Sequence, residues 1–305
     1  MPVTAEAAAR AAVEPRARFS PVVLAERLQG AVLHIAVIGL TIAWMVPAVG
    51  LLVSSFRPFS AITSSGWWTA LSPPFSFTLD NYAKVLQTSH LGQSFFNSFM
   101  ISIPATVIPT TIAAFAAYAF SWMKFPFRDW IFLGLVGLLA VPLQLSFVPV
   151  LKAYVALGIV PQNWGFVGVW LAHTGYGLPF AIYLLANFFR ALPSDLFESA
   201  EIDGAGTLTV FFRIVLPLSV PALASLIIFQ FLWVWNDLLV ALIYVGGAPT
   251  VAPMTVTLAN LTNSLGQDYQ LLTAAAFLSM VIPLIVFLSL QRYFVRGILA
   301  GSVKG

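Results

Sequence analysis

The chain has 305 residues, of which 60% are hydrophobic and 8% are charged, against about 25% charged residues in ordinary soluble domains. Its 14 basic and 11 acidic residues cannot cover a water-soluble globule of this size, so the composition indicates a membrane protein. The net charge of +3 comes from scattered basic residues that form no patch for nucleic acid, and the lack of cysteine excludes a disulfide framework.

The first 30 residues are Ala-rich and carry four Arg and three Glu. The apolar stretch behind them is too long for a cleaved signal peptide, so we expect residues 1–30 to form a cytoplasmic tail. A weaker alternative is an interfacial amphipathic helix around residues 21–29.

Six apolar stretches follow, each long enough to cross a bilayer core of about 30 Å as a helix. They cover residues 31–56, 94–122, 130–152, 164–189, 218–244 and 271–292. Several contain proline, which membrane helices tolerate because neighbouring helices satisfy the freed backbone groups. The sequence thus predicts an all-α, polytopic protein with a six-helix domain over residues 31–294 and a cytoplasmic tail over residues 295–305.

The positions of Lys and Arg predict the orientation of these spans. With the N terminus in the cytoplasm, the inside segments hold Arg10, Arg16, Arg18, Arg27, Lys124, Arg128, Arg190, Arg213, Arg292, Arg296 and Lys304. The outside loops then hold Arg57, Lys84 and Lys152. A division of eleven against three favours six spans with both termini inside.

Two of the expected outer loops are long. In the loop over residues 57–92, a Pro-Pro break precedes Thr78 and Asp80, which predict a capped short helix. The loop over residues 246–269 is rich in Gly and Pro, so we expect it to be re-entrant or packed on the surface.

The loop between the fourth and fifth spans concentrates charge, because three of the eleven acidic residues fall within residues 198–203. Asp195 and Glu198 have the spacing of a capping box, which predicts a short helix. Gly204 can then supply a turn with positive φ, and Thr207 can cap a second helix. A plain capped connection and a docking hairpin both fit this pattern, although a plain connection needs fewer residues.

The same stretch resembles the EAA loop of ABC importer permeases. That pattern is E-A-A, three residues, G, nine residues, I, one residue and L-P. Here it is Glu198-Ser199-Ala200, Gly204 and Ile214-Val215-Leu216-Pro217, with Ser199 in place of Ala. Residues 178–190, 235–237 and 291–305 are similar to permeases of the maltose-permease type, while the first 30 residues match nothing reliable.

The resemblance implies a type I ABC importer permease fold and a coupling helix that docks on a cytoplasmic ATPase. It also implies a location in a bacterial cytoplasmic membrane, a second permease subunit, an ATPase dimer that binds ATP and Mg²⁺, and an extracytoplasmic solute-binding protein. The substrate would be a sugar, as a di- or oligosaccharide. The ATPase-coupling residues carried over from the pattern are Glu198, Ser199, Ala200, Asp203, Gly204, Ile214, Leu216 and Pro217.

No catalytic machinery is visible in the chain. It has no P-loop for ATP phosphates and no complete dinucleotide fingerprint. His34, His90 and His173 are far apart in sequence, and none lies in a metal-binding or catalytic-triad motif. We therefore expect each to be packed in the core or to lie at the membrane interface. We therefore expect no bound cofactor or metal and no enzymatic activity in this subunit.

Asp237 is the acidic residue placed well inside a predicted span. An intramembrane carboxylate is costly, by at least about 2.5 kcal/mol at the midplane, so it should face protein or water. It could line a sugar path or act as a structural hydrogen-bond acceptor, and the sequence leaves both open. The possible path residues are Trp233, Trp235, Asn236, Asp237, Asn187 and Tyr176, with Gln230 and Tyr118 as weaker candidates.

The alternative of a different class is a stand-alone secondary transporter or channel. Such a protein should show repeated broken helices and several intramembrane titratable groups. Asp237 alone is available, and no internal repeat is evident. A structural or sensory membrane protein would leave the EAA spacing unexplained.

Overall fold

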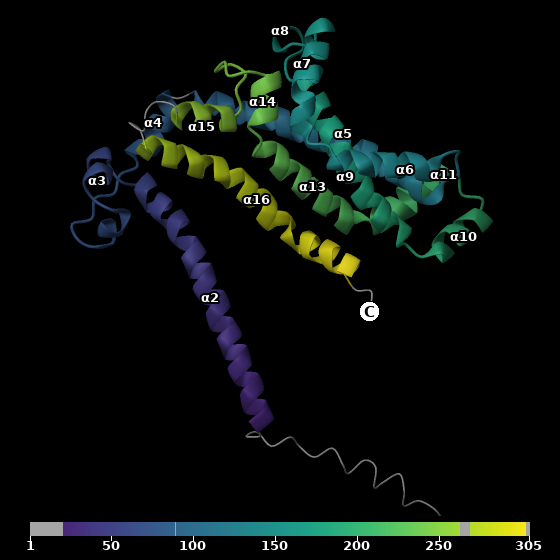
Figure 1. The fold of residues 1–305 in the computed structure, drawn as a ribbon, viewed down its shortest axis with the longest axis horizontal. Coiled ribbons are helices and arrows are strands. Elements are labelled where there is room, and N and C mark those ends of the chain that lie inside the picture. Colours follow the sequence, from purple (N-terminus) through teal and green to yellow (C-terminus); the bar gives the residue numbers. More distant parts are fainter. Residues whose placement is uncertain (1–20, 89, 263–268, 303–305) are drawn as a thin grey trace, which may run out of the picture.

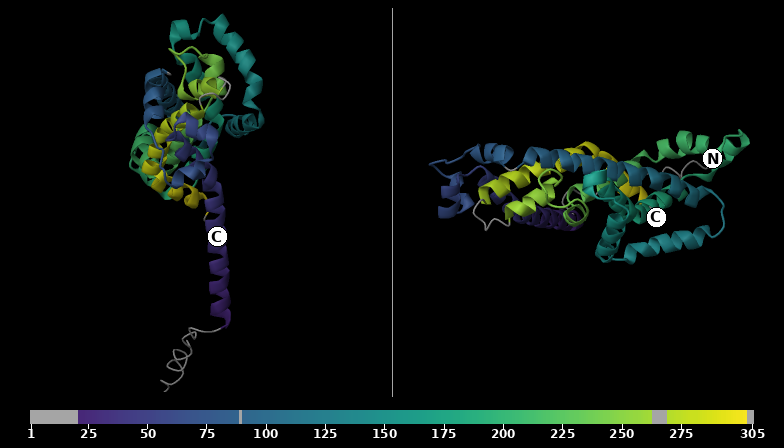
Figure 2. Two further views of the ribbon diagram at one scale, coloured as in Figure 1. Left: turned by 90° about the vertical axis from the view of Figure 1, so that its left-hand side faces the viewer. Right: turned by 90° about the horizontal axis from the view of Figure 1, so that it is seen from above.

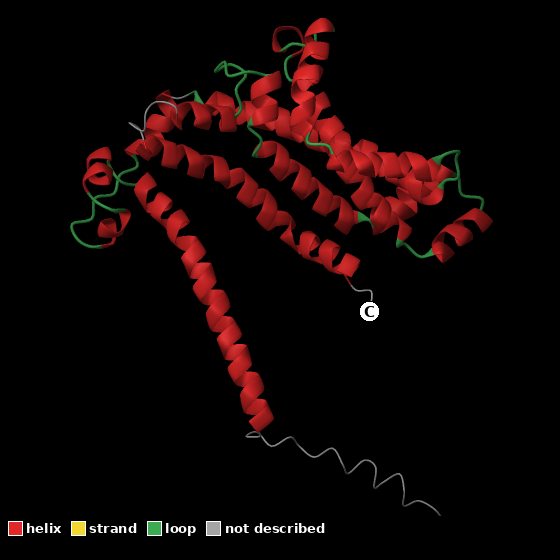
Figure 3. Ribbon diagram, viewed as in Figure 1, coloured by secondary structure: helices red, strands yellow, loops and turns green. Residues whose placement is uncertain are grey.

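The computed structural model describes residues 21–88, 90–262 and 269–302, and over these ranges the protein is helical without a strand (Figure 3). The all-α prediction is confirmed. The α-helices are α2 (Pro21–Ser55), α3 (Phe59–Ser64), α4 (Asp80–Thr88), α5 (Leu91–Trp122), α6 (Arg128–Gly137), α7 (Phe147–Ala156), α8 (Pro161–Trp164), α9 (Val167–Arg190), α10 (Ser194–Ile202), α11 (Thr207–Val210), α12 (Leu216–Leu218), α13 (Val220–Trp235), α14 (Leu239–Tyr244), α15 (Met254–Thr262) and α16 (Tyr269–Ser302). Shorter helical turns are η1 (Trp67–Leu71), η2 (Leu138–Ala140), η3 (Leu143–Ser146) and the π-helical η4 (Phe211–Val215).

Four of the described helices, α2, α5, α9 and α16, are long and apolar enough to cross a membrane, and they match the first, second, fourth and sixth predicted spans. Two of them extend past the predicted limits. The segment expected as a tail or interfacial helix, residues 21–29, continues directly into α2. In the same way, α16 runs into the expected C-terminal tail as far as Ser302.

The third and fifth predicted spans are broken rather than continuous. Residues 128–140 and 143–156 form a pair bent by 95°, and residues 207–218 and 220–235 form a pair bent by 75°. Pro142 follows the first break, and Pro217 and Pro221 flank the second. Proline donates no N–H to the helix ladder, which favours a bend at these points. With each pair counted as one span, the described residues hold six spans.

The centre of the bundle is formed by α5, α9 and α13, with α16 along α13 (Figure 1). Buried alanines on α5 and α9 allow the two helix backbones to approach closely, as is usual in membrane bundles. They include Ala113, Ala114 and Ala117 on α5 and Ala181 and Ala186 on α9. The core therefore depends on small side chains as much as on large ones.

Helix α2 leaves the bundle at an angle, and most of its length projects away from the other helices (Figures 1 and 2). It contacts α16 and η1 near its C-terminal end. There Gly50 lies against Trp67, so close that a Cβ at this position would lie 2.7 Å from the indole Nε1. The apolar side chains along the rest of α2 are exposed, which fits an environment of lipid tails or another membrane subunit.

The two ends of the bundle carry different segments. The α3, α4 and α15 segments gather at one end, and α6, α10 and α11 at the other (Figure 1). The predicted cap of the first long loop is confirmed, because Asp80 begins α4 and its N–H donates to Thr78 Oγ1 at 3.0 Å. This arrangement leaves the α10–α11 hairpin as a separate projection.

Candidate functional site

The turn between α10 and α11 has a well-defined backbone geometry. Gly204 has φ +73°, its N–H donates to the Glu201 carbonyl at 3.0 Å, and the Ala205 N–H donates to the Ala200 carbonyl at 2.9 Å. These two bonds form a Schellman motif, in which the left-handed position favours glycine. The predicted positive φ of Gly204 is confirmed, and a short C-terminal turn of α10 is locked by its own backbone.

Two of the predicted helix caps are wrong. Helix α10 begins at Ser194 behind Pro193, and no side-chain cap hydrogen bond forms at its N terminus. The Ser199 hydroxyl instead donates to the Asp195 carbonyl at 2.8 Å. Thr207 is the first residue of α11 rather than its cap, because Gly206 holds the extended capping position. Pro193 and Gly206 hold the two N-cap positions, and neither has a side chain that can accept a hydrogen bond.

The base of the hairpin is anchored to the bundle by aromatic side chains. The Phe197 ring of α10 stacks on Trp122 at the end of α5, with ring centroids 3.5 Å apart. The Trp122 indole in turn donates to the Phe189 carbonyl of α9 at 3.0 Å. On the α11 side, the Tyr118 hydroxyl donates to the Thr207 carbonyl at 3.3 Å. These contacts link the hairpin directly to α5 and, through Trp122, to α9.

The tip of the hairpin is exposed and acidic. Glu198, Glu201 and Asp203 are exposed, and among the described residues no basic side chain lies within ion-pair distance of them. Ile202 between them is 86% exposed. Of the other pattern residues, Ala200 is buried in the core, Ile214 and Leu216 are half-buried, and Ser199, Gly204 and Pro217 are exposed. This combination of anchored base and unpaired acidic tip is suited to docking a basic protein surface.

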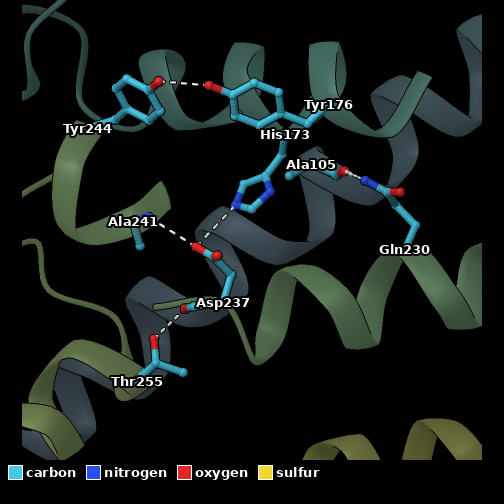
Figure 4. A network of polar contacts seen from close by, with 8 residues as sticks. All are labelled: Ala105, His173, Tyr176, Gln230, Asp237, Ala241, Tyr244 and Thr255. Atoms are coloured by element: carbon cyan, nitrogen blue, oxygen red, sulfur yellow. Dashed lines mark hydrogen bonds and ion pairs between the residues drawn. The ribbon is translucent and has the colours of Figure 1, made fainter. Parts of the chain in front are cut away.

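Asp237 lies away from the α10–α11 hairpin, in the break between α13 and α14 (Figure 4). Helix α13 has 16 residues, so it extends about 24 Å away from the bend at Ser219. The Ala241 N–H donates to Asp237 Oδ2 at 3.1 Å, and the Thr255 hydroxyl donates to the Asp237 carbonyl at 2.6 Å. The expectation of a carboxylate within a continuous helix is wrong, because the helix stops at Trp235.

His173 was not expected to neighbour Asp237. It projects from α9 with its Nε2 3.9 Å from Asp237 Oδ2 (Figure 4). Its ring meets the Trp233 ring edge-on, with ring centroids 5.3 Å apart. The ring is fully buried, and neither nitrogen has a hydrogen-bond partner among the residues that the structure describes. The sequence did offer one signal for this pair, because ionisable residues inside membrane spans tend to lie next to one another.

The other expected path residues do not form one surface with Asp237. Trp235 is buried between helices, where its indole donates to the Ser279 carbonyl at 3.1 Å. Asn236 bonds locally to the Leu232 carbonyl, and Asn187 is exposed near the hairpin end of α9. Only Trp233 shares the Asp237 environment, through His173.

Tyr176 belongs to a second polar contact chain beside this one. Its hydroxyl lies 2.8 Å from that of Tyr244 (Figure 4). It also accepts a hydrogen bond from the Ser146 hydroxyl at 2.9 Å. The weaker candidates serve as helix links, since Gln230 donates to the Ala105 carbonyl at 3.2 Å and Tyr118 bonds Thr207. Within residues 21–88, 90–262 and 269–302, no group of three His, Cys, Asp or Glu side chains could hold a metal ion.

A family profile described as "Binding-protein-dependent transport system inner membrane component" matches residues 95–300, from α5 to α16. The chain belongs to this family. The permease therefore carries both the hairpin and the Asp237 region within the matched segment. Membership supports the importer interpretation over a stand-alone transporter or channel.

Similar proteins agree with this assignment. The permease is 56% identical over 275 residues to the osmoprotective compounds uptake permease protein GgtD of Synechocystis sp., covering 89% of this chain and 91% of that relative. It is 54% identical over 241 residues to the alpha-glucoside transport system permease protein AglG of Rhizobium meliloti, covering 78% of this chain and 63% of the relative.

A solved structure shows the same fold. A bacterial ABC transporter involved in the import of the acidic polysaccharide alginate contains a chain that superposes with a TM-score of 0.75 at 21% identity. The match covers 90% of this permease and 99% of that chain. The expectation of an ABC importer permease fold is confirmed.

Proposed function

We propose that this permease works with a second permease subunit to carry a sugar, as a di- or oligosaccharide, into the cytoplasm. Its α10–α11 hairpin docks on a cytoplasmic ATPase dimer, which binds ATP and Mg²⁺ and performs the hydrolysis. A solute-binding protein delivers the sugar from outside. Both termini of the permease then lie in the cytoplasm, and the permease itself catalyses no reaction.

The observation that carries the coupling proposal is the contrast within the hairpin. Phe197 anchors the helix on Trp122, while Glu198, Glu201 and Asp203 remain exposed without a basic partner among the described residues. Exposed acids beside an exposed Ile202 give a mixed apolar and acidic surface, which complements a cleft with basic rims. The backbone lock at Gly204 keeps this surface in one conformation.

Site-directed crosslinking tests the docking directly. The chain has no cysteine, so an Ile202→Cys variant carries one thiol at an exposed tip position. After labelling with a thiol-specific photocrosslinker, the assembled transporter should yield an adduct between this permease and the ATPase.

The matched control is Phe75→Cys, since Phe75 is also exposed but lies in the loop before α4 at the other end of the bundle. It should yield no ATPase adduct. Equal adducts from both variants, or none from Ile202→Cys in a complex that retains ATPase activity, would contradict the docking proposal.

The proposal of a sugar cargo rests on the names of similar proteins and not on a sugar-binding pocket in this subunit. One close relative is named for alpha-glucoside transport, which makes an alpha-glucoside the first candidate sugar. Another is named for osmoprotective compounds, which makes a small osmoprotectant the second candidate. Thermal unfolding of the cognate binding protein with a panel of both classes tests this choice. Stabilisation by an alpha-glucoside would support the sugar cargo. Stabilisation by a small osmoprotectant alone, or by neither class, would overturn the sugar proposal and leave the docking proposal standing.

A further inference from the structure

Cations and aromatic rings gather at the turn between α5 and α6, which we call the α5–α6 turn (residues 123–130). It forms an open surface hollow of about 440 Å³. The hollow is lined by Lys124, Phe125, Phe127, Arg128, Asp129 and Trp130. None of these residues belongs to the hairpin surface or to the Asp237 environment.

The charges around this hollow are mostly positive. Lys124 is exposed and has no ion-pair partner within the described ranges, while Arg128 pairs with Asp129 at 3.0 Å. Arg190, from the last turn of α9, lies 4.4 Å over the ring of Phe132, one helical turn beyond Arg128. The two cations and one carboxylate of the lining leave one excess positive charge, and Arg190, packed on Phe132 outside the lining, adds a second. This excess attracts an anion.

The aromatic rings at the same place are exposed. Phe127 is 76% exposed and Trp130 is 74% exposed, immediately after a helix that crosses the membrane. Phe127 also holds a left-handed backbone with φ 60°, which is disfavoured for a residue with a Cβ. Rings at the end of a spanning helix, beside Lys and Arg, are typical of the membrane–water interface.

We propose that the α5–α6 turn binds the phosphate headgroup of an anionic phospholipid. Lys124 and Arg128 contact the phosphate, Arg190 adds attraction, and Phe127 and Trp130 insert beside the upper acyl chains. A soluble anion would use the two cations but not the rings, whereas a neutral lipid would use the rings but not the excess charge. The combination of both surfaces favours an anionic lipid.

The site adjoins the base of the hairpin without being part of it. Lys124 follows two residues after Trp122, whose ring stacks on Phe197 of α10. A headgroup held at the turn therefore restrains the chain that supports this stack. The lipid proposal does not rest on the identity of the sugar or of the ATPase.

Fluorescence quenching by brominated lipid tests the site in the full-length permease reconstituted into vesicles. The chain has nine tryptophans, so the emission of Trp130 is obtained as the difference in tryptophan fluorescence between the wild type and the Trp130→Phe variant. Brominated phosphatidylglycerol should quench it at a lower mole fraction than brominated phosphatidylcholine. Loss of each cation should weaken this preference about fivefold, so Lys124→Gln/Arg128→Gln should nearly abolish it.

Two further variants keep the test independent of misfolding. Lys152→Gln removes an exposed cation on α7 and should leave the preference unchanged, whereas Asp129→Asn removes the competing carboxylate and should strengthen it. Equal quenching by the two lipids, or no response to any of these charge changes, would overturn the proposal. If millimolar inorganic phosphate abolished the preference in phosphatidylglycerol vesicles, the site would bind free phosphate and the lipid assignment would be wrong.

Discussion

The α10–α11 hairpin and the Asp237 environment are both acidic, yet they are built in opposite ways. The hairpin acids lie within six consecutive residues, are exposed, and depend on a local backbone motif at Gly204. The Asp237 carboxylate is 13% exposed, accepts a hydrogen bond from the Ala241 N–H on α14, and lies beside His173 on α9. Exposed acids can serve an interface with another protein, whereas a buried acid must first satisfy its own surroundings. We therefore expect substitutions in the hairpin to affect assembly with the ATPase, and substitutions of Asp237 to affect stability or uptake.

The largest effect is expected from Gly204→Arg. A residue with a Cβ costs about 1–2 kcal/mol in the left-handed conformation, and the added cation opposes the acidic tip. Because a Cβ here meets no atom within 4 Å, the permease should still insert. ATP-driven uptake and ATPase co-purification should fall about tenfold or more.

The control is Gly206→Arg, where the space is equally open but φ is −69°. It should cause a clearly smaller loss. Full uptake with retained ATPase in the Gly204→Arg variant would show that the hairpin is a plain connection.

A somewhat smaller effect is expected from Asp237→Ala, which removes the acceptor of the Ala241 N–H. A buried donor left without a partner costs about 1–3 kcal/mol, so the thermal midpoint should fall and uptake should decrease. Asp237→Asn retains an acceptor oxygen and separates loss of the hydrogen bond from loss of charge. Uptake kinetics unchanged in both variants would leave Asp237 with a structural role alone.

An intermediate effect is expected from Phe197→Ala, which removes the stack on Trp122. An aromatic pair contributes about 0.5–1.5 kcal/mol beyond burial, so coupled uptake should fall about two- to tenfold. Leu196→Ala, on the exposed side of α10, is the matched control. Equal losses in both variants would show that the stack does not transmit the movement of the hairpin.

The smallest effect is expected from Glu198→Gln, since exposed charges at an interface contribute about 0.2–1 kcal/mol each. The rate of ATPase association should fall less than about fivefold at low salt, and the difference should disappear at high salt. Asp195→Asn, in the first turn of the same helix, should have less effect. A loss that is independent of salt would indicate a packing role for Glu198 instead of an electrostatic one.

Features that depend on residues close together in the sequence were predicted more accurately than features that depend on residues far apart. The left-handed Gly204 and the Thr78 cap were predicted correctly because each depends on neighbours within a few residues. The caps at Asp195 and Thr207 were wrong because each helix begins earlier in the sequence than the cap required, with Pro193 and Gly206 at the N-cap positions. Local spacing suggests possible caps, but backbone conformation selects among them.

Composition and apolar runs by themselves determined that the protein is a helical membrane protein with six spans, because the bilayer sets both the length and the hydropathy of a span. The EAA spacing likewise located the hairpin. Only the tertiary structure decided that the third and fifth spans bend, that Trp235 is buried between helices and that His173 meets Asp237. These features depend on contacts between residues far apart in sequence, whose proximity no periodicity or local spacing encodes.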